Sequence, residues 1–491
     1  MKIFNTLLKK KQDFVSINPQ EVSMYVCGVT VYDECHLGHA RAYVSFDIVR
    51  RYLEYKNFQV KYIQNFTDID DKIINRALTL KNQSKDDSSL QSCVLELTTK
   101  YINSYFEVMD KLGIKRASLY PKATEHIGEM IDIILGLIKK GYAYEVDGDV
   151  FFEVQKYKEY GALSGRNIDE LQAGQRVEIN EKKRSPLDFV LWKKAKENEP
   201  FWESPWGNGR PGWHIECSAM SLKYLGEEFD IHGGGFDLVF PHHENEIAQS
   251  RCFTGKKFVH YWMHNGFLTI DKEKMSKSLG NFFTLKDIFL KFHPEIVRFF
   301  FISAHYRSPL DFHDEKLLSA KEQMERGYMM LKNIELKFIL SDYKVNAEFF
   351  YEKYEDIKAI KEKFISGMDD DFNTAIAVAC LFDLVNIANA ILLLKKVTTD
   401  ELDKLAAIEN LFNEISNVLN IFKFRKHIIS IDTDVKEELH KKIKQLLLER
   451  VDARKNKDWI AADKIRDTIK TLTDDIELED TPKGTFVSTK Y

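Results

Sequence analysis

Two histidines near the start of the chain have the types and spacing of phosphate-binding side chains. His36 and His39 flank Gly38 in the segment HLGH, where a strand-like run gives way to a helix-like one. The first N–H groups of a helix lack partners within it, and the helix dipole adds positive charge there, so this position suits a phosphate. Two imidazoles could add hydrogen bonds, and a glycine lets a ligand approach the backbone. A structural turn is the alternative for so short a motif.

A second segment, KMSKSLGN, begins at Lys274 and combines basic and small residues. Lys274 and Lys277 are point charges suited to a triphosphate, and Gly280 could serve as a hinge for a closing loop. Taken by itself, the segment also fits an exposed charged loop.

A third group of residues has the chemistry of metal ligands. In FPHHENE, His242 and Glu246 are four positions apart. In a helix they lie on one face, where they could hold one Zn²⁺, and His243 is expected to point elsewhere. The thiols nearest to the other motifs are Cys27 and Cys217, although a lone buried cysteine is also a small hydrophobe. The sequence has no CxxC motif, so a metal site must be assembled from distant segments.

Composition indicates a soluble protein of several domains. The chain has 491 residues, enough for about three to five domains. Its net charge is −5, and its six cysteines do not suggest a disulfide framework. We see neither a signal peptide nor an apolar run approaching the ~20 residues of a membrane span, and therefore expect a cytoplasmic protein.

The elements around HLGH are expected to form a βαβ unit. Residues 21–32 are rich in Val and Tyr and predict a strand, 36–57 have apolar residues near helical spacing, and 58–66 alternate as a second strand. Strand, helix and strand so close together predict a parallel sheet with a right-handed crossover. The fold class is therefore α/β.

Residues 116–205 interrupt this pattern and look like an insertion between two halves of the sheet domain. A long apolar-periodic helix is expected to end at Gly141, and alternating runs around Asp147 and Gly148 predict a hairpin. From 316 to 425 the sequence predicts several amphipathic helices, followed by one or two basic helices.

HLGH and KMSKS together, with 235 positions from His39 to Lys274, resemble the class I aminoacyl-tRNA synthetases. Longer segments resemble the cysteinyl-tRNA synthetases in particular: MYVCGVTVYDECHLGHAR, NFTDIDDKII, SPWGNGRPGWHIECSAM, DIHGGGFDLVFPHHENEIAQS, EKMSKSLGNFF and AHYRSPLDF. MDDDFNTAIAVACLFDL and LEDTPKGTF resemble the tRNA-binding half of that family. The resemblance runs from end to end of the chain.

This resemblance implies a Rossmann-like parallel sheet with an inserted connective domain, followed by an α-helical bundle and a small C-terminal domain. The expected parts are 1–115 and 206–270 for the two halves of the catalytic domain, 116–205 for the connective domain, 271–315 for the KMSKS-loop linker, 316–425 for the tRNA-binding bundle and 426–491 for the anticodon-binding domain. The short insertion is consistent with a synthetase that has no editing domain.

The resemblance also implies roles for individual residues. The expected zinc ligands, which place the metal beside the nucleotide site, are Cys27, Cys217, His242 and Glu246. The residues expected to act in catalysis on ATP are His36, His39, Lys274 and Lys277. Further contacts to ATP are expected from Gly38, Asp237 and Ser276. The residues expected to line the substrate pocket are Gly28, Thr67, Trp213 and His232.

Some of these positions have structural alternatives, and two others depart from the family pattern. Trp213 could belong to the core, His232 could cap a turn, and Asp237 could hold a loop. Val29 stands where the family usually has proline, and Phe486 stands where members often have tryptophan. The first change removes a fixed φ angle but no ligand, and the second removes an indole donor.

The implied reaction has two steps. The carboxylate of cysteine attacks the α-phosphorus of ATP, which is accompanied by Mg²⁺, and a ribose hydroxyl of the tRNA end then takes the cysteinyl group. Thiolate binding to Zn²⁺ would separate cysteine from serine, because an alcohol is a poorer ligand. Four protein ligands usually mark a closed zinc site, so the ion would have to expand to five-coordination. The implied partners are tRNA(Cys), ATP and L-cysteine, with a monomer and no membrane.

Two other functions compete with this interpretation. The ATP-dependent cysteine ligase of mycothiol synthesis shares the catalytic core but lacks the tRNA-binding half, so residues 316–491 argue against it. A non-catalytic RNA-binding regulator derived from a synthetase should have damaged motifs, whereas HLGH and KMSKS are intact here.

Overall fold

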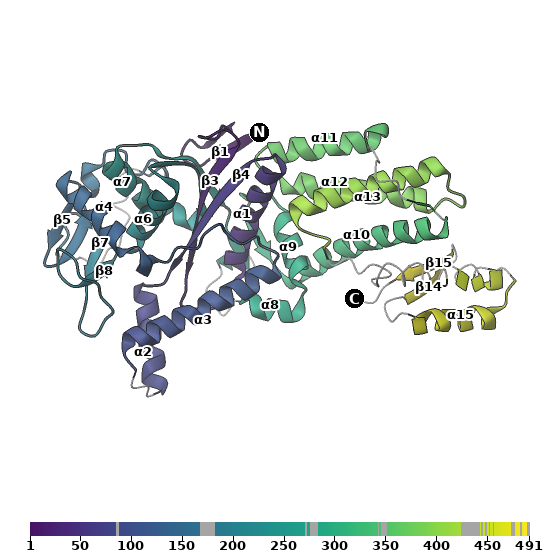
Figure 1. The fold of residues 1–491 in the computed structure, drawn as a ribbon, viewed down its shortest axis with the longest axis horizontal. Coiled ribbons are helices and arrows are strands. Elements are labelled where there is room, and N and C mark those ends of the chain that lie inside the picture. The colour runs from purple at the N-terminus through teal and green to yellow at the C-terminus, as the bar shows by residue number, and fades with distance from the viewer. Residues whose placement is uncertain are drawn as a thin grey trace. The chain divides into compact units, whose positions relative to one another are not determined.

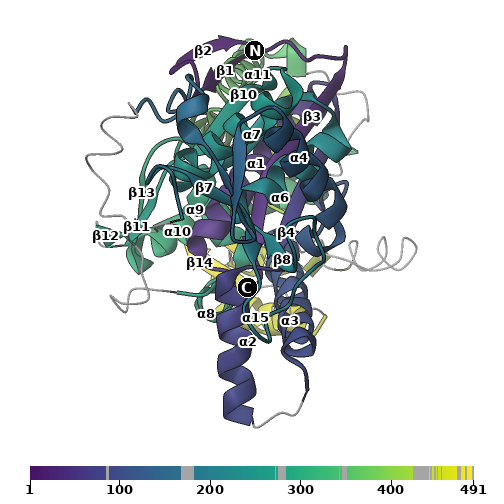
Figure 2. The same ribbon diagram turned by 90° about the vertical axis from the view of Figure 1, so that its left-hand side faces the viewer.

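The computed structural model describes residues 1–84, 88–166, 182–270, 273–274, 283–341, 343–344, 351–423, 442, 445–446, 449–450, 452–454, 456–472, 477–481 and 484–488. The chain divides into two compact units (Figures 1 and 2). The first unit is Met1–Asp314 with Met368–Thr374, and the second is Glu315–Gly367 with Ala375–Tyr491.

A four-stranded parallel sheet forms the centre of the first unit, with strand order β10-β9-β3-β4. Its strands are β3 (Glu21–Thr30), β4 (Gln59–Thr67), β9 (Glu228–Gly235) and β10 (Phe258–Asn265). The middle of β3, from Met24 to Cys27, is buried throughout, as a parallel strand covered on both faces should be. The sheet confirms the predicted α/β class.

Helix α1 (Leu37–Tyr55) connects β3 to β4 and completes the predicted βαβ unit (Figure 1). Its Asp47 accepts hydrogen bonds from Arg51 at 2.7 Å and from Arg298 of α9 (Pro294–Ile302) at 2.5 Å. Asp47 and Arg298 are almost fully buried, so this ion pair joins the two helices inside the unit. Helices α2 (Asp71–Ser84) and α3 (Leu90–Lys111) follow β4.

The predicted insertion, 116–205, holds three strands of an antiparallel sheet of order β5-β6-β7-β8, and the fourth strand, β8 (Gly209–Pro211), follows the predicted boundary. The other elements of this region are η1 (Ala123–Glu125), α4 (Ile127–Lys139), β5 (Ala143–Val146), β6 (Asp149–Phe152), η2 (Val154–Lys156) and β7 (Phe189–Lys194). Asp147 and Gly148 have φ angles of 53° and 86° between the paired residues Val146 and Asp149. This two-residue turn confirms the predicted hairpin.

The chain then returns to the central sheet. Helix α6 (Trp213–Leu225) precedes β9, and β9 is connected to β10 by η3 (Phe236–Leu238), η4 (Val239–His243) and α7 (Glu244–Thr254). A small sheet of order β12-β11-β13 follows, formed by β11 (Leu268–Ile270), β12 (Glu273–Lys274) and β13 (Leu310–Phe312), with α8 (Leu285–Lys291) before α9. Because β12 pairs with β11, the backbone of Lys274 is attached to this sheet.

An N-terminal hairpin of β1 (Lys2–Asn5) and β2 (Lys10–Asp13) and the segment Met368–Thr374 complete the first unit. Asp371 of that segment is fully buried. Its carboxylate accepts hydrogen bonds from the Phe4 amide at 2.9 Å, the Tyr306 hydroxyl at 2.8 Å and Arg307 Nε at 2.6 Å. The MDDDFNT segment, which the resemblance places in the tRNA-binding half, therefore belongs to the first unit.

The second unit is mainly helical, as predicted. Its elements are α10 (Asp314–Leu340), η6 (Tyr351–Lys353), α11 (Glu355–Asp369), α12 (Thr374–Leu392), α13 (Thr399–Leu419), α15 (Trp459–Leu472) and the antiparallel strands β14 (Glu477–Thr481) and β15 (Gly484–Ser488). Phe486 lies on β15, opposite Glu479. The finer domain boundaries stay predictions.

Helix α12 corrects one expectation from the sequence. It is 19 residues long with a mean hydropathy of 2.1, so by length and composition it could cross a membrane. Several of its apolar side chains, including Leu381 and Leu384, are fully buried in the unit, and its Asp383 pairs with Lys363 of α11 at 2.8 Å. These contacts are typical of the core helix of a bundle.

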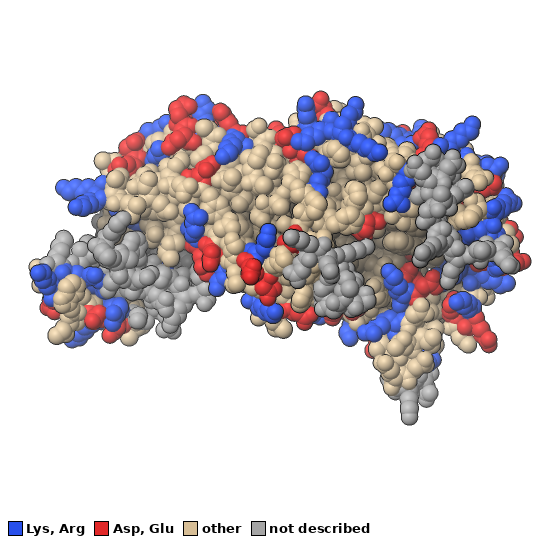
Figure 3. Space-filling model, turned by 180° about the vertical axis from the view of Figure 1, so that it is seen from behind, with Lys and Arg blue, Asp and Glu red and all other residues tan. Residues whose placement is uncertain are grey.

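Charged side chains of both signs are interspersed on the face of the molecule seen in Figure 3. This distribution agrees with the small net charge of −5.

Candidate functional site

The predicted site residues gather where three parallel strands end. Cys27 and Gly28 lie in the carboxyl half of β3, Thr67 is the last residue of β4, and His232 lies in the carboxyl half of β9. In open parallel sheets, ligands bind at this edge of the strands. The fold thus brings together residues that the sequence keeps far apart.

The four predicted metal ligands form one buried cluster. The sulfurs of Cys27 and Cys217 are 3.8 Å apart, Cys27 Sγ is 3.7 Å from Glu246 Oε1, and His242 Nε2 is 3.0 Å from the same oxygen. With Zn–S bonds of about 2.3 Å, tetrahedral coordination separates two sulfurs by about 3.8 Å. The spacing and donor set therefore fit a single metal ion.

The cluster contains both ionised ligands and one protonated histidine. Burial lowers the pKa of His242, but Glu246 and Cys217 outweigh it and raise the pKa to about 10, so this imidazole must lose a proton when a metal binds. Burial raises the pKa of Glu246, but His232 and His242 outweigh it and bring the pKa down to about 2, so the carboxylate is ionised. A hydrogen bond from Cys27 lowers the pKa of Cys217 to about 6, whereas burial raises the pKa of Cys27. Cys217 is therefore readily ionised to a thiolate, whereas Cys27 requires a nearby cation to lose its proton.

His243 was expected to point away from the metal, and this prediction is wrong. Its Nε2 lies 3.3 Å from Cys27 Sγ, and it belongs to a second possible donor set with Cys27, His232 and Glu246. Cys27 Sγ, which both donor sets share, lies close enough to reach the rings of both His242 and His243. The two sets share Cys27 and Glu246, and the set with Cys217 offers the second soft thiolate that suits zinc.

The histidines are held by neighbouring rings and carboxylates. The ring of His242 stacks on Trp213 at 4.5 Å, and its Nδ1 is 2.9 Å from His214 Nδ1. His232 Nε2 is 2.9 Å from Glu246 Oε2, so His232 orients this carboxylate rather than capping a turn. Trp213 is 41% exposed and so is not a core residue. Such outer contacts fix the direction of metal ligands.

The HLGH segment forms the capped start of α1, as predicted. His36 is the N-cap, its Nδ1 accepts from the Gly38 amide at 3.1 Å, and His39 Nδ1 accepts from the His36 amide at 3.3 Å. The two rings stack at 3.7 Å. Burial lowers the pKa of His36 to about 4 and that of His39 well below its usual value, so both imidazoles are neutral at pH 7.

Both ends of the KMSKS region are attached close to HLGH. On the carboxyl side, Thr284 forms a β-bridge with His36, and the Leu285 amide donates to the Cys35 carbonyl at 2.8 Å. On the amino side, β12 pairs with β11, and β11 begins directly after Phe267. The carbonyl of Phe267 accepts a hydrogen bond from Arg41 of α1 at 3.0 Å. Ser276 and Lys277 themselves lie outside the described residues.

Whole-length relatives identify the family. The chain is 52% identical over 490 residues to a protein named cysteine–tRNA ligase from Carboxydothermus hydrogenoformans, covering 99% of each. It is 49% identical over 506 residues to the cysteine–tRNA ligase of Thermodesulfovibrio yellowstonii, covering 100% of each. This chain belongs to the cysteine–tRNA ligases. The models of the class I (C) tRNA synthetase catalytic domain and of the DALR domain match residues 13–322 and 363–423.

Other aminoacyl-tRNA synthetases share the fold of this cysteine–tRNA ligase family member. A structure of Mycobacterium tuberculosis methionyl-tRNA synthetase in complex with methionyl-adenylate superposes with a TM-score of 0.61 at 13% identity. It covers 87% of this chain and 94% of that one. At this identity the likeness shows the fold alone.

The predicted pocket residues also have specific neighbours. The Gly28 amide donates to Asn65 Oδ1 at 2.9 Å, and the Thr67 hydroxyl donates to Glu216 Oε2 at 2.7 Å. Asp237 is exposed in η3. Sequence reasoning missed Asn65 and Glu216. The adjacency of Glu216 to Cys217 in WHIECSAM was the one local signal for it.

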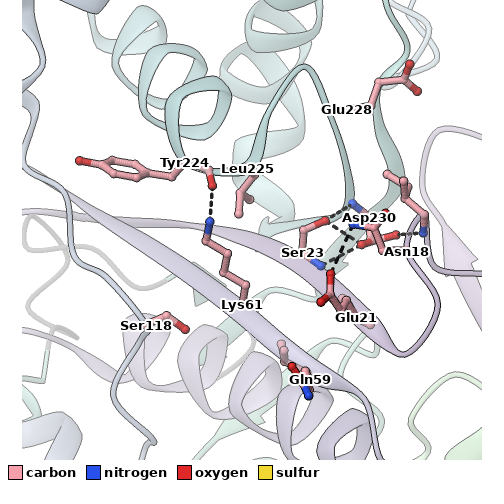
Figure 4. A pocket seen from close by; sticks show the side chains of 13 residues that line it. Asn18, Glu21, Ser23, Gln59, Lys61, Ser118, Tyr224, Leu225, Glu228 and Asp230 are labelled. Carbon is pink, nitrogen blue, oxygen red and sulfur yellow. Dashed lines mark hydrogen bonds between the residues drawn. The ribbon is translucent and has the colours of Figure 1, made fainter.

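A cavity of about 480 Å³ lies at the opposite, amino-terminal ends of the strands (Figure 4). It is lined by the first residues of β3, β4 and β9, among others. The Asp230 carboxylate there accepts from the Ile17 and Ser23 amides, and Lys61 Nζ donates to the Tyr224 carbonyl. Several of its polar groups make structural contacts, and none of the predicted site residues lines it.

Proposed function

We propose that this protein activates L-cysteine with ATP and transfers it to tRNA(Cys). The observation that carries this proposal is the buried two-thiol cluster beside the HLGH helix start, in a chain whose whole-length relatives are named cysteine–tRNA ligases. A carboxylate oxygen of cysteine bonds to the α-phosphorus of ATP, and pyrophosphate leaves. A terminal ribose hydroxyl of the tRNA then attacks the acyl carbon, and AMP leaves.

The protein's contribution to the first step is to position ATP and to stabilise the charge that develops. His36 and His39 lie at the start of α1, where neutral imidazoles and the positive end of the helix dipole suit an anion, and Gly38 keeps the approach open. We assign Asp237 to binding of the adenosine part of ATP. We assign stabilisation of the leaving pyrophosphate to Lys274, Ser276 and Lys277, together with Mg²⁺ bound to the phosphates.

On the amino-acid side we assign Cys27, Cys217, His242 and Glu246 to one Zn²⁺. When bound, this ion would supply a soft Lewis acid that prefers the substrate thiolate to the alcohol of serine. Gly28, Thr67, Trp213 and His232 surround the cluster through the contacts described above. Trp213, stacked on His242 and 41% exposed, offers a flat surface to the substrate beside the ligands.

The helical second unit supports a tRNA substrate over a small-molecule acceptor. The DALR model matches 363–423 within it, and the whole chain aligns with relatives named as tRNA ligases. A cysteine ligase of mycothiol synthesis would not need this half. We further propose a monomer located in the cytoplasm.

The direct test is transfer of radiolabelled cysteine by the purified full chain. Attachment to tRNA(Cys), and not to a glucosamine–inositol acceptor, is the expected result. Transfer to the amino sugar alone would replace the proposal with the mycothiol-type ligase. Failure to form the adenylate, in folded and metal-loaded protein, would favour a non-catalytic regulator.

A further inference from the structure

Arg41 is a buried cation on the helix that begins with HLGH. It lies in the second turn of α1, two positions after His39, and is 2% exposed. Among the residues that the structure describes, no carboxylate pairs with it, and burial lowers its pKa to about 10, so it is still charged at pH 7. A buried charge is costly unless hydrogen bonds compensate it. The groups that compensate Arg41 therefore indicate its role.

Backbone carbonyls of two separate segments contact the guanidinium of Arg41. Its Nη1 donates to the Phe267 carbonyl at 3.0 Å. Its Nη2 donates to the Ser308 carbonyl and, at 3.4 Å, to the Tyr306 carbonyl. A guanidinium is planar and has five N–H donors, so it can hold several carbonyls in one fixed geometry. One side chain of α1 thus fixes the backbone at two places.

These two places form the base of the small sheet that carries Lys274. The Gly266 amide donates to the Tyr306 carbonyl at 2.8 Å, and the Leu310 amide donates to the Phe267 carbonyl at 3.0 Å. From this base β11 and β13 run parallel to each other. In the described sheet, β12, which ends at Lys274, pairs with β11 alone. The position of the Lys274 backbone therefore depends on the carbonyls that α1 holds.

The segment around Tyr306 is also held from its other side. The Tyr306 hydroxyl donates to the buried Asp371 at 2.8 Å, and Arg307 Nε donates to the same carboxylate at 2.6 Å. Gly266 packs against this segment so closely that a Cβ there would lie 2.5 Å from the Arg307 carbonyl oxygen. The carbonyls that Arg41 contacts therefore belong to a segment with little freedom to move away from it.

The contact made by Arg41 complements the attachment at the other end of the KMSKS region. There the contacts to the start of α1 are made by the backbone, through the bridge between Thr284 and His36 and the hydrogen bond from the Leu285 amide to the Cys35 carbonyl. On the amino side an arginine side chain makes the contact instead. A substitution of Arg41 therefore releases one end while the other stays attached.

We infer that Arg41 is a positioning residue for the reaction with ATP: it fixes the strand that carries Lys274 against the helix start that carries His36 and His39. The inference rests on the proposed function, which assigns these three side chains to the phosphates of ATP. It goes beyond that proposal by assigning the alignment of the two phosphate-binding elements to one buried residue. A misplacement of about 1 Å in such an alignment can lower a rate by about 100-fold.

A double-mutant cycle in ATP–pyrophosphate exchange tests this role. Arg41→Gln should lower kcat by about 10- to 100-fold, as for loss of charged hydrogen bonds, while the KM for cysteine and the bound zinc stay within about twofold. Lys274→Ala should lower kcat by about 100-fold or more. Because Arg41 acts through the position of Lys274, the double variant should be no more than about threefold slower than Lys274→Ala.

Arg50→Gln is the matched control. Arg50 is a buried arginine of the same helix, and its Nη1 donates to the Arg116 carbonyl at 2.6 Å, outside the small sheet. It should lower stability in denaturant titration as Arg41→Gln does, but leave kcat within about twofold. If Arg41→Gln does not fold, Arg41→Lys takes its place in the cycle. Lysine keeps the charge but not the planar fork, so kcat should fall by a smaller factor, and again only when Lys274 is present.

Three results would overturn the inference and give Arg41 a purely structural role. They are an unchanged kcat in the folded Arg41 variant, losses that multiply in the double variant, and an equal loss of cysteine binding and zinc. Full activity of Lys274→Ala would also overturn it. Absence of exchange in the unaltered protein would instead count against the proposed function.

Discussion

The sulfurs of Cys27 and Cys217 lie 3.8 Å apart, although 190 positions separate the two residues in the chain. Cys27 is on the central strand β3 and Cys217 is on α6, which follows the inserted sheet. The donor set exists only when both halves of the sheet are folded together. A metal ion bound by this donor set would therefore stabilise the folded state of the first unit, as metals do wherever their ligands come from distant segments.

Replacing Cys217 with serine should affect cysteine far more than ATP. A hydroxyl is a weak zinc ligand, so metal affinity should fall by about 100-fold or more, and the KM for cysteine should rise in parallel. The KM for ATP should change little, because the substitution does not alter the helix start that we assign to the phosphates. Metal content and exchange kinetics measure these effects. Cys252→Ser, another buried cysteine of the same unit, is the control and should retain metal. Equal loss of ATP and cysteine binding, with unfolding, would indicate a purely structural metal.

Gly28→Ala should disrupt the central sheet. A Cβ at this position would lie 1.5 Å from the backbone oxygen of Asn65 on the neighbouring strand, and neither strand can move easily inside the sheet. We expect a loss of about 4 kcal/mol or more in the free energy of unfolding, measured by denaturant titration. Gly128→Ala is the matched control, because nothing lies within 4 Å of its Cβ in α4. It should stabilise the protein by about 0.5–1 kcal/mol. Normal stability of Gly28→Ala would show that the two strands are further apart.

The βαβ unit and the hairpin could be predicted because their signals are local. The Val- and Tyr-rich run at 21–32 predicts the strand and the helical spacing in 36–57 predicts the helix, and Asp147-Gly148 supplies the two positive φ angles of the turn. The HLGH helix start was predictable for the same reason.

The metal cluster could not be derived from spacing, because its ligands come from β3, α6 and the segment around α7. The direction of His243 was mispredicted because Cys27, which comes from β3, lies close to both His242 and His243, and helical spacing alone does not show this. Glu216 gave no sign of burial, because one acidic residue in a helix is normally exposed. Tertiary structure alone showed that it faces Thr67.

The buried Asp47–Arg298 pair predicts a specific dependence of stability on pH. Burial alone raises the pKa of Asp47, but Arg298 and Arg51 outweigh it and hold the pKa below its usual value of 3.8. A carboxyl with a lowered folded-state pKa stabilises the fold above the unfolded pKa, and this contribution is lost as the pH falls through the folded one. Asp47→Asn should therefore cost about 3–5 kcal/mol at pH 7 by leaving Arg298 buried and unpaired.

Denaturant titration at several pH values measures this effect. The difference between Asp47→Asn and the unaltered protein should be constant near neutrality and shrink below about pH 4. Asp110→Asn removes a carboxylate from an exposed pair with Arg116 and should change stability by less than about 1 kcal/mol. A difference that persists unchanged into strong acid would contradict the assigned charge on Asp47.

Two substitutions of His36 separate its capping role from its role toward phosphate. Asparagine is also a good N-cap, so His36→Asn should keep the stability of α1, whereas His36→Ala should lose about 1 kcal/mol. Both remove the imidazole, and both should lower kcat for exchange by about 100- to 1000-fold without raising the KM for cysteine. Full activity of His36→Asn would show that His36 acts only as the helix cap.

The central claim is that a metal ion held by the buried cluster binds the thiol of the substrate. ATP–pyrophosphate exchange, measured with cysteine and with serine before and after complete metal removal, tests it most directly. We predict exchange that requires cysteine, ignores serine, stops when the metal is removed and returns when Zn²⁺ is restored. Undiminished, cysteine-specific exchange in metal-free protein would contradict the account.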